Sequence, residues 1–102
     1  MPLVQQALER LESEIRTSSM QGTKVLTFIH GYGSSGEGGA IKAAVLRQLH
    51  FFCHQGRIKE IILGEEFEGR SGRGRQLLRR FPFLANHRDL NRANPGITLV
   101  IL

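Results

Sequence analysis

Apolar residues recur along the chain with two different spacings, and these spacings predict its secondary structure. Over residues 2–17, and again over 40–49, they lie three to four positions apart, which is the period of an amphipathic helix. Three short runs are instead almost continuously apolar and rich in β-branched residues, a composition typical of strands that are buried on both faces. These runs predict strands at 24–29, 58–63 and 97–102.

The order of these elements predicts a small α/β domain. Strands that are separated by helices usually form parallel pairs joined by right-handed crossovers, so we expect parallel pairing within the sheet. A length of 102 residues suits a single domain over 1–102 with one core. Residues 64–96 form a long insertion before the last strand. Its glycines predict a mobile first part, and one or two helical turns are expected at 76–81.

The net charge of +5 originates in that insertion. Residues 67–95 contain seven arginines and only two acidic residues, whereas the rest of the chain contains equal numbers of bases and acids. Such a segment is either a solvated loop or a patch that meets a phosphate backbone, and the use of Arg without Lys favours the patch. We therefore expect DNA or RNA as the partner. The arginines assigned to this contact are Arg70, Arg73, Arg75, Arg79 and Arg80.

Other features of the composition narrow the class of protein. No apolar run approaches the length of a membrane helix, and the acidic, amphipathic N-terminus does not resemble a signal peptide, so we expect no membrane partner. The single cysteine, Cys53, excludes an internal disulfide and suits a cytoplasmic location. His50 and His54 flank it at helical spacing, but a metal there would lack further ligands. We expect neither a metal nor another cofactor.

The stretch between the first strand and the second helix carries most of the candidate chemistry. It follows His30 and contains five glycines in nine residues. A glycine-rich turn at the start of a helix directs backbone N–H groups and the positive end of the helix dipole at an anion, most often a phosphate. The loop residues assigned to nucleic-acid binding are Gly31, Tyr32, Gly33, Ser34, Ser35 and Gly36.

Each of these side chains also has a purely structural interpretation. His30 either fixes the loop by a hydrogen bond or binds phosphate and transfers a proton, and it is the candidate catalytic residue. Tyr32 either stacks on a base or packs on the following helix. Ser34 and Ser35 either donate to phosphate or cap the helix. Gly31 can supply a positive φ angle as well as a close approach to phosphate.

Three better-known glycine motifs fit this loop less well. The G-x-G-x-x-G spacing matches the dinucleotide fingerprint, but the acidic residue that should follow the next strand appears only at Glu65, too far along the chain. A P-loop would need Gly-Lys-Ser/Thr. The oxyanion loop of an α/β-hydrolase would need a later G-x-S-x-G elbow and a larger sheet.

The stretch FIHGYGSSG resembles the second signature of the Smr (small MutS-related) domain, a strand that ends in His-Gly-x-Gly and leads into a helix. The segments QALERLESEI, AIKAAVLRQL and ITLVIL are similar to the first helix, second helix and closing strand of that family. The resemblance implies a small two-layer sandwich of order βαβαββ, like the C-terminal domain of translation initiation factor three. It also implies binding of DNA or RNA, in some members with nicking endonuclease activity.

The chain differs from the family pattern at several points. The first signature, a strand ending in Leu-Asp-x-His-Gly, would lie before Met1, and its acidic residue is tied to the nuclease activity of the family. We therefore expect the fold with its first strand missing, and weak or absent cleavage. Tyr32 stands where the family often has Lys, and residues 64–96 are longer than the usual final hairpin.

An alternative function follows from the missing strand. Loss of the first strand would expose one edge of the sheet, and no proline or inward-pointing charge interrupts the three apolar runs. The chain would then act as a protein-interaction or assembly module, pairing through that edge as a homodimer. Residues 64–96 are long enough to cover the edge instead.

Overall fold

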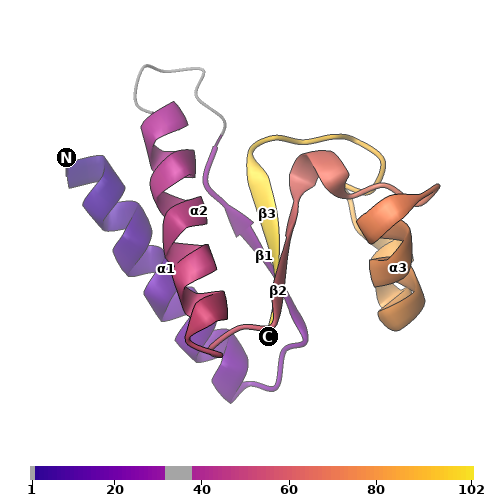
Figure 1. Cartoon of the computed structure of the whole chain (residues 1–102), viewed down its shortest axis with the longest axis horizontal. Coiled ribbons are helices and arrows are strands. Elements are labelled where there is room, and N and C mark those ends of the chain that lie inside the picture. Colours follow the sequence, from indigo (N-terminus) through magenta and orange to yellow (C-terminus); the bar gives the residue numbers. More distant parts are fainter. Residues whose placement is uncertain (1, 32–37) are drawn as a thin grey trace.

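The computed structural model describes residues 2–31 and 38–102. In this part of the chain two helices lie side by side next to a three-stranded sheet, and a third helix lies beyond the sheet (Figure 1). None of the described helices is long and apolar enough to cross a lipid bilayer. The elements are α1 (Pro2–Met20), β1 (Val25–Ile29), α2 (Gly38–His54), β2 (Glu60–Leu63), the 3₁₀ helix η1 (Gly64–Glu66), α3 (Gly72–Arg80), the 3₁₀ helix η2 (Pro82–Asn86) and β3 (Ile97–Ile101).

The prediction of parallel strand pairs is wrong for the sheet that is described. Its order is β1-β3-β2, and β3 pairs antiparallel with both neighbours, placing Ile101 opposite Val25 on one side and Glu60 on the other. β1 and β2 run in the same direction, as expected across a helix, but β3 lies between them. The reason is that residues 64–96 bring the chain back to the end of β2 before β3 begins. Asn94 lies directly against Gly64 there, so closely that a Cβ on Gly64 would be 1.8 Å from the Asn94 carbonyl oxygen.

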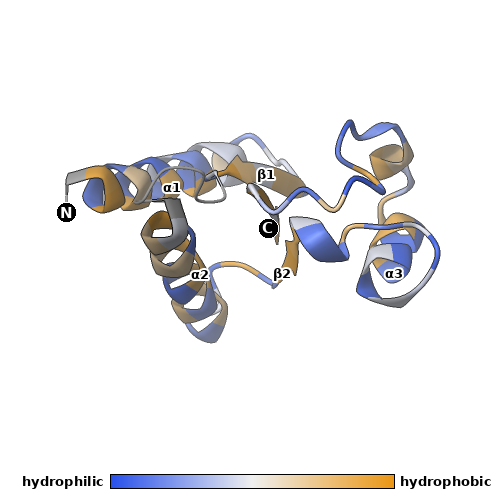
Figure 2. Ribbon diagram, turned by 90° about the horizontal axis from the view of Figure 1, so that it is seen from above, coloured by the Kyte–Doolittle hydropathy of each residue, from blue (hydrophilic) through white to orange (hydrophobic). Residues whose placement is uncertain are grey.

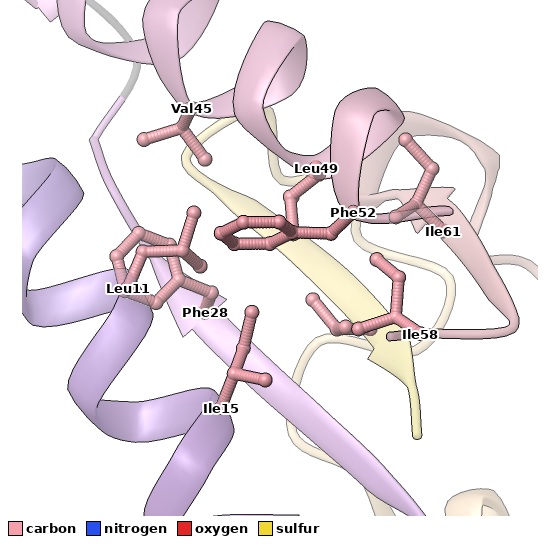
Figure 3. Close-up of a cluster of buried hydrophobic side chains, with 9 residues drawn as sticks. Leu11, Ile15, Phe28, Val45, Leu49, Phe52, Ile58 and Ile61 are labelled. Atoms are coloured by element: carbon pink, nitrogen blue, oxygen red, sulfur yellow. The ribbon is translucent and has the colours of Figure 1, made fainter. Parts of the chain in front are cut away.

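The first core lies between the sheet and the two long helices. Leu11 and Ile15 of α1 and Val45, Leu49 and Phe52 of α2 point toward the sheet (Figure 3). There they meet Phe28, Ile61 and Val100 of the three strands and Ile58, which lies just before β2. These residues are buried, and their spacing on the helices is the three-to-four-residue period that the sequence predicted. The helix layer on the sheet confirms the expected small α/β architecture.

The opposite face of the sheet is covered by residues 64–96. Alternate residues of the central strand, Ile97, Leu99 and Ile101, point to this side. They pack with Ile62 and with three residues of the insertion, Phe67, Leu77 and Leu84. Viewed from above, α1 and α2 lie on one side of the strands and α3 on the other (Figure 2). The insertion is therefore a packed part of the domain.

The helix in the insertion begins earlier than residues 76–81, where helical turns were expected. α3 starts at Gly72, and the preceding Ser71 donates its backbone N–H and its hydroxyl to Glu68. Gly74 is buried against the turn before it, because a Cβ at this position would lie 2.3 Å from the carbonyl oxygen of Glu68. The expectation of a mobile glycine segment is thus corrected at Gly74, where glycine permits close packing of helix on backbone.

Candidate nucleic-acid interface

His30 is held in place by hydrogen bonds at both ring nitrogens. Its Nδ1 lies 2.6 Å from the carbonyl oxygen of Gly31, and its Nε2 lies 3.0 Å from the hydroxyl oxygen of Thr98. Because a carbonyl only accepts, Nδ1 carries the proton and Nε2 accepts from the hydroxyl. The side chain is 8% exposed, and burial lowers its pKa, although the hydrogen bond to Gly31 opposes this. This geometry matches the interpretation in which His30 fixes the start of the loop.

Gly31 begins the glycine loop in a left-handed conformation. Its φ angle is +81°, which side-chain-bearing residues rarely adopt. The N–H groups of His30 and Gly31 both donate to the carbonyl of Gly96, at 2.9 and 3.0 Å. The chain therefore leaves β1 at a fixed angle. The remaining loop residues assigned to binding, Tyr32, Gly33, Ser34, Ser35 and Gly36, lie outside the described residues.

A pocket of about 440 Å³ opens beside this turn, between α1, α2 and the end of β1. Its polar side chains include Gln6 and Arg10 of α1, together with His30. The guanidinium of Arg10 lies 4.4 Å from the centre of the Phe28 ring and donates to the carbonyl of Ile29. Sequence reasoning missed Arg10, because it lies on the polar side of an amphipathic helix with nothing nearby in the sequence to mark it.

Two arginines of the predicted patch are paired with acids. Arg73 lies 3.1 Å from Glu60 and 3.5 Å from Glu66, and Arg80 lies 2.7 Å from Glu60. Partial burial opposes ionisation of Glu60, but the hydrogen bonds from Arg80 and Arg73 outweigh it and lower the pKa of Glu60. These two arginines therefore dock α3 beside β2, and their charge is largely compensated.

The other three arginines of the patch are exposed. Arg70, Arg75 and Arg79 form no ion pair with any acid of the described residues, and Arg75 makes only a long contact of 3.5 Å with the Arg70 carbonyl. Arg75 and Arg79 are one helical turn apart and line a shallow depression of about 290 Å³ together with Ser71, Gly72 and Gln76. This face of α3 carries uncompensated positive charge next to hydroxyl and amide groups.

Two aromatic rings lie at the C-terminal end of α3. Phe81 and Phe83 are in edge contact, with ring centres 6.0 Å apart, and the guanidinium of Arg80 lies 5.3 Å from the Phe81 ring. Phe83 is 58% exposed, which is unusual for a phenylalanine. No feature of the sequence had marked Phe83, because its neighbours Pro82 and Leu84 suggested an ordinary apolar turn.

The structure separates the two parts of the predicted site. The turn at His30 and Gly31 lies at the end of β1 near α1 and α2, whereas α3 lies on the far side of β2 (Figure 1). The five arginines share one region and all are exposed, but Arg73 and Arg80 are paired with acids, which leaves three guanidinium groups without an ion pair among the described residues. Within residues 2–31 and 38–102, no group of three or more His, Cys, Asp or Glu side chains is arranged to hold a metal.

Comparison with known proteins does not identify the chain: no family model, no curated protein and no solved structure matches it.

Proposed function

We propose that this chain binds DNA or RNA through the exposed face of α3, as a domain of Smr type. The observation that carries the proposal is the difference among the arginines of the insertion. Arg73 and Arg80 form ion pairs with Glu60. Arg70, Arg75 and Arg79 face solvent and form no ion pair with an acid among the described residues. The pKa of Glu68 is nevertheless lowered, first by the hydrogen bond from the Ser71 hydroxyl and further by the nearby charge of Arg70. Solvent-facing guanidinium groups spaced along a helix suit contacts to successive phosphates.

The aromatic pair favours single strands over duplexes. Phe83 offers an exposed ring just after the C-terminal end of α3, next to Phe81. Unpaired bases can stack on such a ring while the adjacent phosphates meet arginines, and this combination is typical of proteins that bind single-stranded nucleic acid. A duplex keeps its bases stacked on one another and gains only the phosphate contacts.

Binding without efficient cleavage fits the turn at His30. Both ring nitrogens of His30 are occupied by intramolecular hydrogen bonds, and burial disfavours the protonated form. A general acid or base must reach the reacting group with one free nitrogen. Nicking activity, as found in some members of the resembling family, is therefore expected to be weak or absent.

The proposal is tested by comparing two double variants of equal charge. Arg75→Ala with Arg79→Ala removes two exposed guanidinium groups of α3. Arg16→Ala with Arg47→Ala removes two exposed arginines from α1 and α2 and serves as the matched control. Fluorescence anisotropy with a labelled single-stranded oligonucleotide should show at least tenfold weaker binding for the α3 pair only. Equal binding by both pairs, or no binding by the unmodified chain, would refute the proposal.

A further inference from the structure

The backbone N–H and C=O groups of successive β1 residues point alternately toward β3 and away from the sheet. Leu102 donates to the carbonyl of Lys24 and His30 donates to that of Gly96, while Leu26 and Phe28 lie opposite Val100 and Thr98. In an antiparallel pair the hydrogen-bonded residues are every second one, so the even-numbered residues of β1 bond to β3. The N–H and C=O groups of Val25, Thr27 and Ile29 therefore point away from the sheet.

The other edge of the sheet is closed by the chain itself. On β2 the outward groups belong to Ile61 and Leu63, by the same alternation. The carbonyl of Ile61 accepts from Arg73 at 2.7 Å, and the N–H of Leu63 donates to Glu66 at 3.0 Å. Both side chains belong to residues 64–96. The sequence suggested that this insertion could cover an edge of the sheet, and it does so at β2.

The backbone groups at the β1 edge have little such cover, although the side chain of His87 in the insertion contacts the Thr27 hydroxyl at 2.8 Å. Arg10 donates to the carbonyl of Ile29, and among the described residues the remaining outward backbone groups of β1 have no hydrogen-bond partner. Ile29 is 62% exposed, and residues 25–29 contain no charge, proline or glycine that would discourage strand addition. The other side chains of β1 are partly or fully buried, so it is the unpaired backbone edge, together with Ile29, that offers a template for another strand.

We propose that β1 pairs antiparallel with β1 of a second copy of this chain, with the two Thr27 residues opposite each other. This register is self-complementary, because it also places each Val25 opposite an Ile29 on the same face of the extended sheet. The pair would form about six new backbone hydrogen bonds. Arg10 need not move away, because the Ile29 carbonyl has two lone pairs and can accept from both donors.

The surroundings of Ile29 favour a second copy over an unrelated strand. A hollow of about 370 Å³ adjoins Ile29 and Thr27, and its remaining lining is Ile97 together with the polar residues His87, Arg88, Asp89 and Asn94. In the proposed register Val25 of the second copy lies beside this hollow, and the two-fold axis repeats the contact on the other subunit. The self-complementary register therefore buries both exposed Ile29 side chains in one dimer, each against a Val25 side chain of the other subunit.

This proposal is independent of nucleic-acid binding. α3 lies beyond β2, at the opposite edge from β1, so the dimer would place one arginine face at each end of a continuous six-stranded sheet. Loss of the dimer should leave the α3 face of each subunit intact.

Sedimentation at micromolar concentration tests the dimer. We expect the unmodified chain to have twice its monomer mass of 11.4 kDa and Ile29→Lys to be monomeric. Met20→Lys, which adds the same charge at a position 82% exposed on α1, should remain dimeric. Circular dichroism checks that each variant is folded. A monomeric unmodified chain, or a dimer that survives Ile29→Lys, would overturn the proposal.

Hydrogen exchange on the unmodified chain gives a second readout that needs no variant. On dilution from the dimer, the amides of Val25, Thr27 and Ile29 should lose protection, while those of Leu26 and Phe28 should keep it. Equal behaviour of odd- and even-numbered amides would contradict pairing through β1.

Discussion

The Nε2 atom of His30 accepts a hydrogen bond from the hydroxyl of Thr98 across 3.0 Å, in the interior of the domain. Thr98 is completely buried in the central strand, and it is the only polar residue of β3. The pair therefore joins the end of β1 to the middle strand and orients the first residue of the glycine loop.

We expect this pair to stabilise the fold. Thr98→Val preserves the shape of the side chain but leaves Nε2 of His30 buried without a partner, and His30→Ala leaves the Thr98 hydroxyl in the same state. Each should lower the free energy of unfolding by about 1–3 kcal/mol. Urea denaturation of both single variants and the double variant measures the coupling. Strictly additive effects would show that the two side chains do not interact.

The buried imidazole also predicts a pH dependence of stability. Burial lowers the pKa of His30 below its usual 6.5, so the unfolded chain takes up a proton at a higher pH than the folded chain. The free energy of unfolding should therefore fall as the pH decreases from about 7 through 6.5 toward the lowered pKa. The pKa values of Glu60 and Glu65 are lowered from 4.5, so these carboxyl groups change the stability only in a separate, more acidic pH range.

His30→Gln provides the control for this pH dependence, because it removes the titrating group while keeping hydrogen-bonding atoms. Its stability should be flatter than that of the unmodified chain between about pH 5 and 7, as measured by urea denaturation at several pH values. Parallel curves for the two proteins would mean that His30 titrates equally in the folded and unfolded chains.

Gly74 should be the glycine of α3 least tolerant of substitution. In Gly74→Ala the new Cβ would lie 2.3 Å from the Glu68 carbonyl oxygen, so helix and turn must separate. We expect a decrease of about 1–3 kcal/mol in the free energy of unfolding. Gly39→Ala on α2 is the control, since a Cβ there meets nothing within 4 Å and alanine favours helix. A thermal melt in which both variants behave alike would contradict this packing.

The sequence predicted the elements that form around the first core better than those around the second. Helix 2–17 and the three apolar runs agree with α1 and the strands to within a few residues, because each is long or uniform enough to show a period. The second core draws Phe67 from the turn after η1, Leu77 from α3 and Leu84 from η2, so no single window contains a pattern.

Strand pairing and the contacts of the arginines were less predictable for a different reason. The antiparallel sheet depends on Gly64 meeting Asn94, and the neutralisation of Arg80 depends on Glu60, twenty residues away. Such contacts between distant residues leave no mark on local spacing. Net charge correctly indicated a basic segment but could not tell exposed arginines from those bound to acids.

Phe83 should contribute to the binding of single strands, if α3 binds nucleic acid as proposed. Base stacking on an aromatic side chain contributes about 1–3 kcal/mol, so Phe83→Ala should weaken binding of a single-stranded oligonucleotide about 5- to 150-fold. Binding of a duplex of the same sequence should change little. Phe51→Ala, which removes a phenylalanine 53% exposed on α2, is the control. Equal weakening of single-strand and duplex binding would argue against stacking.

The salt dependence of binding tests the central claim most directly, because phosphate contacts release counterions and packing contacts do not. The logarithm of the affinity for a single-stranded oligonucleotide should fall linearly with the logarithm of salt concentration. In the variant carrying Arg75→Ala and Arg79→Ala, the slope should be smaller by about 1.4, or about 0.7 for each phosphate that an arginine no longer neutralises. The control carrying Arg16→Ala and Arg47→Ala should keep the slope of the unmodified chain. An unchanged slope in the α3 variant would contradict the assignment of α3 as the nucleic-acid contact.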